Sequence, residues 1–167
     1  GYVLDGQVAH FALGPYDSKR PLTIDPVVVF ATYTGSTADN WGFTATYDAQ
    51  GNLYSGGIVF SIGYPTTTGA YQTRFAGLID IGIIKYNTST NGPSARVWAT
   101  YLGGASADFP ASLVVNSLGE LLILGTTSSN TYPVTAGALQ GRFAGGTNAD
   151  PYGYGTGYGL PNGSDLV

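Results

Sequence analysis

The sequence predicts an all-β protein built from repeated antiparallel units, and three observations lead to this prediction. The 167 residues include 26 Gly and 9 Pro, a share well above the usual one and typical of a chain with many turns. Short runs rich in β-branched and aromatic residues alternate with turn-forming residues, whereas no long stretch has the period of a helix. A block of sequence also occurs twice, in the same order.

The repeat is clearest in the segment YPTTTGAYQTRFAG, residues 64–77, which recurs as YPVTAGALQGRFAG, residues 132–145. The two copies are 68 residues apart. The same spacing matches VFATYTG, residues 29–35, with VWATYLG, residues 97–103. A run of identities this long does not arise by chance, so the chain contains two copies of one structural unit.

Four runs of the first copy, and a fifth run at the start of the second copy, predict strands because they are rich in residues that favour a pleated backbone. The residues between the second and third runs, Asp48-Ala49-Gln50-Gly51-Asn52, predict a hairpin turn, since Asp bonds its own backbone and Gly supplies a positive φ. The predicted strands are Val27 to Thr34, Phe43 to Tyr47, Leu53 to Phe60, Ile81 to Tyr86 and Arg96 to Leu102.

The second copy repeats the hairpin and then departs from the pattern. Leu113 to Val115 and Leu121 to Gly125 predict strands on either side of a turn at residues 116–120. A Gly/Tyr-rich insertion follows, and Asp165 to Val167 is the counterpart of the strand that begins at Asp80. A four-stranded antiparallel unit repeated at this spacing is what a blade of a β-propeller requires, so we expect propeller-like blades in a partial β-propeller.

This interpretation divides the chain into two parts. Residues 1–26 are expected to be the C-terminal end of an upstream β-rich domain, and residues 27–167 the propeller repeats. One complete unit covers about residues 27–94, and a second, incomplete unit covers about residues 95–167 with its insertion at residues 150–163. Since a propeller closes with roughly 4 to 8 blades, two units call for more repeats in a longer chain or for several copies that assemble a ring.

Charge and composition exclude several classes of function. With 6 Lys and Arg against 10 Asp and Glu, the net charge of −4 argues against binding to nucleic acid or to an anionic membrane. The absence of Cys excludes a disulfide framework, a thiolate zinc site and a cysteine nucleophile. No apolar run is long enough for a membrane span, no signal peptide is evident, and the start at Gly1 suggests a processed or partial product.

The motifs together resemble the bacterial β-propeller repeat often called SBBP, and the resemblance covers about residues 27–146. Its elements are a TY-L/x-GG stretch, an aspartate, a D-x-x-G-N-x-Y hairpin, a Y/F-P-T-x-G-A-x-Q stretch and a G-G-x-D-x-x-x-x-K strand. The corresponding residues here are Thr32–Gly35 and Thr100–Gly104, Asp48–Tyr54, Tyr64–Gln72 and Gly77–Lys85. The first 26 residues, with Tyr16-Asp17 and residues 21–26 (PLTIDP), look like the end of the domain that precedes such repeats in large exported surface proteins of gliding and related Gram-negative bacteria.

The resemblance implies an extracellular or outer-surface location and a non-catalytic role in adhesion or in binding a surface glycan or protein, with no cofactor. Two alternatives remain. The chain is part of an exported, glycan-active hydrolase, or it is a structural scaffold or a secretion substrate held by its export apparatus. This sequence departs from the pattern at residues 116–120, which lack the Asp and Asn of the hairpin, and in the Gly/Tyr insertion.

Residues suited to catalysis are few. His10 is the only histidine and lies in a predicted strand, where a structural role is expected. A single His cannot form a two-histidine metal site, and the acidic residues lack the spacing of a calcium loop. A one-residue slip in the repeat sets Asp39 against Asp108, a pair that could serve glycoside hydrolysis, although equivalent positions favour a turn cap in each blade. An enzyme is therefore not expected.

The insertion supplies the candidate binding residues, Tyr152, Tyr154 and Tyr158. Tyrosines on a pliable loop offer flat contact area and a hydroxyl for sugar rings or a protein surface. The alternative is a low-complexity loop that contacts nothing specific. Arg74 and Arg142 stand at matching positions, which favours packing or salt bridges within each blade over ligand recognition.

Overall fold

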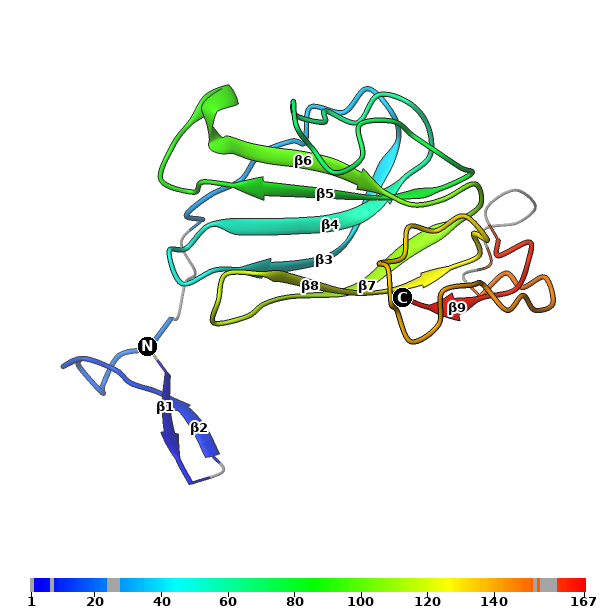
Figure 1. The fold of residues 1–167 in the computed structure, drawn as a ribbon. Helices are drawn as coiled ribbons and strands as arrows, with labels where there is room; N and C mark the ends of the chain where they lie inside the picture. The colour runs from blue at the N-terminus through cyan, green and yellow to red at the C-terminus, as the bar shows by residue number, and fades with distance from the viewer. Residues whose placement is uncertain (1, 7, 24–27, 152, 154–158) are drawn as a thin grey trace.

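The computed structural model describes residues 2–6, 8–23, 28–151, 153 and 159–167, and these form three antiparallel sheets (Figure 1). The all-β prediction is confirmed. Within the described ranges, helical structure is limited to the 3₁₀ turn η1 (Gly92–Ala95).

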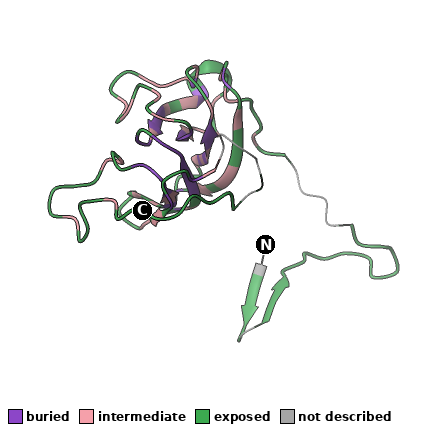
Figure 2. Ribbon diagram, turned by 90° about the vertical axis from the view of Figure 1, so that its right-hand side faces the viewer, coloured by how far each residue is buried: buried purple, intermediate pink, exposed green. Residues whose placement is uncertain are grey.

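The first sheet is a two-stranded hairpin of β1 (Tyr2–Asp5) and β2 (Val8–Phe11). His10 lies in β2 opposite Val3, as a strand position predicts, and its side chain is exposed. Figures 1 and 2 show this hairpin apart from the two larger sheets. That residues 1–26 end a separate domain stays a prediction.

Four strands form a meander in which each strand pairs with the next along the chain, in the order β3-β4-β5-β6. We call this the first blade-sheet. Its strands are β3 (Asn40–Tyr47), β4 (Leu53–Val59), β5 (Asp80–Tyr86) and β6 (Arg96–Leu102).

A second sheet repeats this arrangement with three strands, β7 (Asp108–Val115), β8 (Leu121–Thr127) and β9 (Asp165–Leu166). We call it the second blade-sheet. It has no counterpart of β6 among the described residues. The first blade-sheet takes β6 from the beginning of the second sequence repeat, so sheets and sequence repeats are out of phase by one strand.

The turn of each first hairpin forms as the sequence predicts. Asp48 Oδ1 accepts the backbone N–H groups of Gln50 and Asn52 at 3.0 and 2.9 Å. In the second blade-sheet Asn116 Oδ1 accepts the N–H groups of Leu118 and Glu120, each at 2.9 Å. The amide oxygen of Asn116 therefore takes the place of the Asp48 carboxylate without loss of the turn.

Strand register fixes which residues of the two sheets are equivalent, and it corrects one prediction. Both first hairpins carry a bulge at the same place, between Gly42 and Thr44 and between Pro110 and Ser112. Asn40 pairs with Val59, and Asp108 pairs with Thr127, 68 residues further on in each case. The equivalent of Asp108 is thus Asn40, and the slip that set Asp39 against Asp108 was wrong.

A second correction concerns Val27 to Thr34. The described part, residues 28–34, has no strand pairing, although its sequence matches that of β6. The reason is physical: β6 is a strand because six of its seven residues pair with β5, whereas no strand of the described chain pairs with residues 28–34. Propensity alone does not form a strand without a partner.

Two apolar clusters hold the fold together. One lies between the two blade-sheets and contains Ile58, Ile79, Ala107, Phe109 and Leu160. The other covers the opposite face of the first blade-sheet, where Tyr64, Tyr86 and Tyr101 are buried. Figure 2 shows the buried residues gathered in this central region. Each fully buried aliphatic side chain contributes about 1.5–3 kcal/mol.

Candidate functional site

The tyrosines predicted to bind, Tyr152, Tyr154 and Tyr158, lie outside the described residues, but the two ends of their insertion are described. Ala149 and Leu160 exchange two backbone hydrogen bonds of 3.2 and 2.7 Å. Leu160 is 3% exposed and packs in the cluster between the blade-sheets. The insertion therefore leaves and re-enters the fold at one point.

Asn162 fixes this base of the insertion further. Its backbone N–H donates to Ser128 Oγ at 3.0 Å, and its side-chain amide donates to the Ser128 carbonyl at 3.0 Å. Gly163 approaches Gly146 so closely that a Cβ on Gly163 would lie 2.3 Å from the Gly146 Cα. These contacts tie the loop base to the second blade-sheet.

The structure brings together two carboxylates that the sequence analysis did not pair. Asp80 at the start of β5 and Asp108 at the start of β7 are both 0% exposed. Asp80 Oδ1 and Asp108 Oδ2 lie 2.6 and 2.8 Å from the position that a Cβ on Gly103 would occupy. The two acids therefore flank one glycine at the junction of the blade-sheets.

Hydrogen bonds satisfy most of the oxygens of this pair. Asp108 accepts hydrogen bonds from Thr127, Ser129 and the Gly104 N–H. Asp80 Oδ2 accepts the Ala76 N–H at 2.8 Å, whereas Asp80 Oδ1 has no partner in the described structure. Asp108 thus caps the turn before β7, as a turn-cap role predicts.

Burial is the main cause of the altered acidity of both groups. Burial, together with the charge of Asp108, raises the pKa of Asp80 to about 7 against the opposing hydrogen bonds. Burial also raises the pKa of Asp108. Below about pH 7 the junction therefore keeps a proton that a solvated aspartate would release.

The carboxylate pair considered for glycoside hydrolysis is not assembled. Asp39 is exposed and contributes its backbone carbonyl to the N–H of Phe60, while Asp108 is buried. Asp80 and Asp108 lie close together, yet neither is open to solvent. Recurrence could have identified Asp80 and its partner Gln72, because both return in the second repeat as Asp165 and Gln140.

A separate cluster stabilises the first hairpin. Lys85 Nζ lies 3.0 Å from Asp48 Oδ2 and 4.8 Å from the centre of the Tyr54 ring. Burial alone would raise the pKa of Asp48, but hydrogen bonds from Asn52 and Lys85 hold it well below its usual range. The cluster is a structural ion pair, because each member is engaged within the hairpin and the strand beside it.

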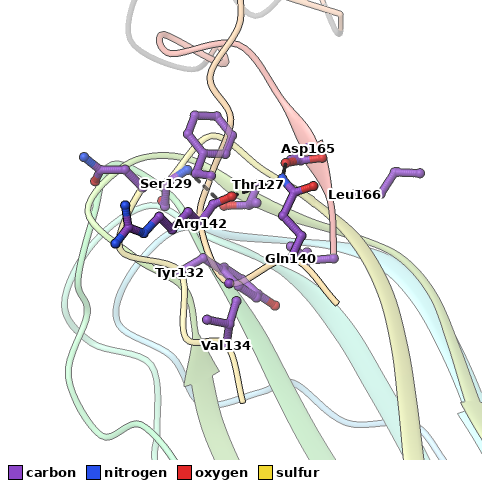
Figure 3. Close-up of a pocket in the computed structure, with 12 residues that line it drawn as sticks. Thr127, Ser129, Tyr132, Val134, Gln140, Arg142, Asp165 and Leu166 are labelled. Carbon is purple, nitrogen blue, oxygen red and sulfur yellow. Dashed lines mark hydrogen bonds between the residues drawn. The ribbon is translucent and has the colours of Figure 1, made fainter. Parts of the chain in front are cut away.

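A pocket of about 120 Å³ opens beside β8 and β9, and Figure 3 shows its lining. Tyr132 and Val134 lie at one side, and Gln140 points to Asp165, with Nε2 3.0 Å from Oδ2. Arg142 also lines it. The volume is below the 300–1,000 Å³ usual for small-molecule sites, so the pocket is matched to a single side chain or ring.

The two matching arginines are both exposed, Arg142 beside this pocket and Arg74 beside another lined by Tyr64, Phe75 and Tyr101. Neither forms an ion pair with the described residues, so the salt bridge that sequence equivalence favoured is not seen there.

Within the described ranges no group of three or more His, Asp or Glu side chains is placed to hold a metal ion. Those ranges also contain no helix of the length and apolarity needed to cross a membrane. No protein-family model, curated protein or solved structure matches the chain.

Proposed function

We propose that this chain is a non-catalytic segment of an exported or surface-displayed β-propeller protein of the SBBP type, and that it binds a protein or glycan at the cell surface. The two antiparallel blade-sheets, stacked through Ile58 and Phe109, support consecutive propeller blades. The order of the repeated motifs supports the family. The resemblance of residues 1–26 to the domain that precedes such repeats in exported surface proteins supports the location.

The observation that carries the binding role is the anchored base of the Gly/Tyr insertion. Ala149 and Leu160 close it with two hydrogen bonds, and Leu160 is buried in the core. A loop held at both ends by a rigid sheet is the usual arrangement for recognition residues. Tyr152, Tyr154 and Tyr158 are therefore proposed as the contact residues, with rings that stack on sugars or on a protein surface.

The test replaces these three tyrosines with serine and measures binding to a glycan array and to the surface of the source cells. Loss of binding with an unchanged thermal midpoint supports the proposal. A matched control replaces three exposed tyrosines elsewhere, Tyr16, Tyr47 and Tyr71, with serine, and it should bind as the parent does. Equal binding by the parent and the insertion variant would remove the insertion from the function.

A structural scaffold is the second candidate, favoured by the contact between the blade-sheets. A Cβ on Gly56 of β4 would lie 2.8 Å from Leu113 Cδ1 of β7, so the sheets stack closely. A scaffold needs this stacking and no ligand. Retained surface assembly by the insertion variant, with no ligand found for the parent, would favour the scaffold.

A further inference from the structure

The fourth strand of the first blade-sheet places one tyrosine at the centre of a set of contacts. Tyr101 of β6 is 2% exposed, and its hydroxyl accepts the N–H groups of Gly63 and Tyr64 at 3.2 and 2.9 Å. Its ring centre lies 5.5 Å from that of Tyr64 and 5.9 Å from that of Phe75. Tyr101, the tyrosine of the TY-L/x-GG stretch in β6, therefore inserts between the YP motif (Tyr64-Pro65) and the RF motif (Arg74-Phe75).

Gln72 holds the same strand through its main chain and side chain. Its carbonyl accepts the Tyr101 N–H at 3.0 Å, and its side-chain oxygen accepts the Gly103 N–H at 3.1 Å. Its Nε2 donates to Asp80 Oδ2 at 3.1 Å. Gln72 therefore joins the third strand to the fourth.

The second blade-sheet has the equivalents of these groups, but the described chain places no strand among them. Tyr132, Phe143 and Gln140 occupy the positions of Tyr64, Phe75 and Gln72, and they line the pocket of Figure 3. Gln140 already makes the equivalent bond to Asp165 at 3.0 Å. This pocket lies where the tyrosine of a fourth strand would insert.

One described segment carries the sequence of a fourth strand without a strand to pair with. Residues 28–35, VVFATYTG, match RVWATYLG at residues 96–103. Tyr33 is the equivalent of Tyr101, and it is 97% exposed where Tyr101 is 2% exposed. Val28 and Val29 are 78% and 83% exposed. The segment thus presents the side chain that the pocket fits.

The segment cannot reach the pocket of its own molecule. Phe30 packs on Tyr86, with ring centres 5.5 Å apart, as part of the cluster on the face of the first blade-sheet that points away from the second. The first blade-sheet therefore lies between the segment and the pocket. The segment therefore has no strand partner among the described residues of its own molecule, and a second copy of the chain can supply one.

We propose that the second blade-sheet of one copy of this chain accepts residues 28–35 of another copy as its fourth strand, with Tyr33 in the pocket between Tyr132 and Phe143. The added strand pairs with the outer edge of β9. Strand addition of this kind gains affinity from main-chain hydrogen bonds and specificity from the side-chain pocket. The contact is head-to-tail, so it builds rings or chains of copies rather than a symmetric dimer.

The outer face of the second blade-sheet supports the same arrangement. Leu122 and Leu124 of β8 are 52% and 50% exposed, while their equivalents in β4, Tyr54 and Gly56, are buried against the next sheet. The equivalents of Leu113 and Val115 in β3 are Ala45 and Tyr47, which are exposed. When two copies join, the outer face of β8 in one copy covers the exposed face of β3 in the other. This contact is equivalent to the one between β4 and β7 within a single chain.

The register of the first blade-sheet specifies a cross-link that tests this pairing. Ile81 of β5 lies opposite Leu102 of β6, and the equivalent pair is Leu166 with Thr34 of the other copy. The chain contains no cysteine, so no native thiol competes in the cross-linking reaction. Chains with Thr34→Cys and chains with Leu166→Cys can therefore be mixed and mildly oxidised. A control mixture uses Thr34→Cys with Leu139→Cys, another exposed leucine of the second repeat.

We expect the Thr34–Leu166 disulfide dimer, identified by intact mass, in at least tenfold higher yield than the Thr34–Leu139 dimer. Equal yields would overturn the proposal. Sedimentation of the cysteine-free chain gives an independent measurement: Tyr33→Ala should weaken self-association at least tenfold, and Tyr16→Ala should leave it unchanged. A chain that stays monomeric at every concentration would also overturn it. Neither result bears on the ligand of the Gly/Tyr insertion.

Discussion

The two blade-sheets carry the same motifs in different surroundings, and the contrast separates what a motif encodes from what its neighbours supply. In the first, the YP, Q and RF motifs close around Tyr101 of a fourth strand. In the second, the same motifs leave a pocket open beside β9. The first blade-sheet is therefore completed by a strand from the next repeat, whereas the second has no fourth strand among the described residues.

The largest expected effect comes from Tyr101, which is buried, whereas its sequence equivalent Tyr33 is exposed. Tyr101→Ala should lower the free energy of unfolding by about 3–5 kcal/mol, because it empties a buried aromatic site and leaves two N–H groups unpaired. Tyr33→Ala should leave the unfolding of the dilute monomer unchanged. Urea denaturation of both variants checks this, and equal losses would show that Tyr33 is packed within its own chain.

A second comparison concerns the position that faces the next sheet. Gly56→Leu should cost about 1–3 kcal/mol, because even its Cβ would press on Leu113 and on Thr44, 3.1 Å away. Leu124 occupies the equivalent position on the open face of the second blade-sheet. Removing its side chain in Leu124→Ala should lower the free energy of unfolding by well under about 1 kcal/mol, because this side chain is half exposed. Thermal unfolding of the two variants gives the measurement. A larger loss of stability in Leu124→Ala than in Gly56→Leu would contradict the contact of β4 with β7 and the exposure of β8.

The carboxylates at the junction predict a specific pH dependence. The pKa of Asp80 is raised from 3.8 to about 7, so the native state keeps a proton that the unfolded state releases in this window. The free energy of unfolding should therefore fall as the pH rises from 3.8 to about 7 and change no further above it. Asp80→Asn should flatten this slope and gain about 1–3 kcal/mol at pH 8.

The matched control is Asp165→Asn, at the equivalent and partly exposed position of the second blade-sheet. This variant should keep the slope of the parent. Denaturation series between pH 4 and pH 8 decide the point. A slope that survives in Asp80→Asn would assign it to another group.

The smallest effect is expected in the first hairpin. Asp48→Asn gives this turn the chemistry of Asn116 in the second hairpin, where the amide oxygen accepts the same two N–H groups. The ion pair with Lys85 is lost, together with the hydrogen bonds that Asp48 Oδ2 accepts from the Asn52 amide and the Tyr54 hydroxyl, so the thermal midpoint should fall at pH 7. Because the pKa of Asp48 lies below its usual range, the difference from the parent should vanish as the solution becomes strongly acidic.

Much of this fold was predictable because short-range patterns determine it. Alternating strand residues and Asp or Asn turns predicted both first hairpins, although β3 and β7 begin earlier than expected, at Asn40 and Asp108. Val27 to Thr34 was predicted as a strand because the run is rich in β-branched and aromatic residues. The pattern could not show that a strand partner is missing there.

The candidate site was less predictable, since it depends on contacts between repeats. Asp80 and Asp108 come together only when the two blade-sheets stack, and their burial follows from that stacking. The Asp39 equivalence failed because a sequence slip was inferred where a strand bulge keeps the register. Tyr152, Tyr154 and Tyr158 stay predictions, supported by the anchored ends of their insertion.

The most direct test of the comparison is residue-resolved amide hydrogen exchange of the chain in dilute solution. Val167 bonds Gly125 of β8, so the N–H of its neighbour Leu166 points to the open edge, whereas the equivalent Ile81 lies between β4 and β6. We predict slow exchange at Ile81 and fast exchange at Leu166 that slows as the chain is concentrated. Equal protection of both residues in the monomer would contradict the open edge.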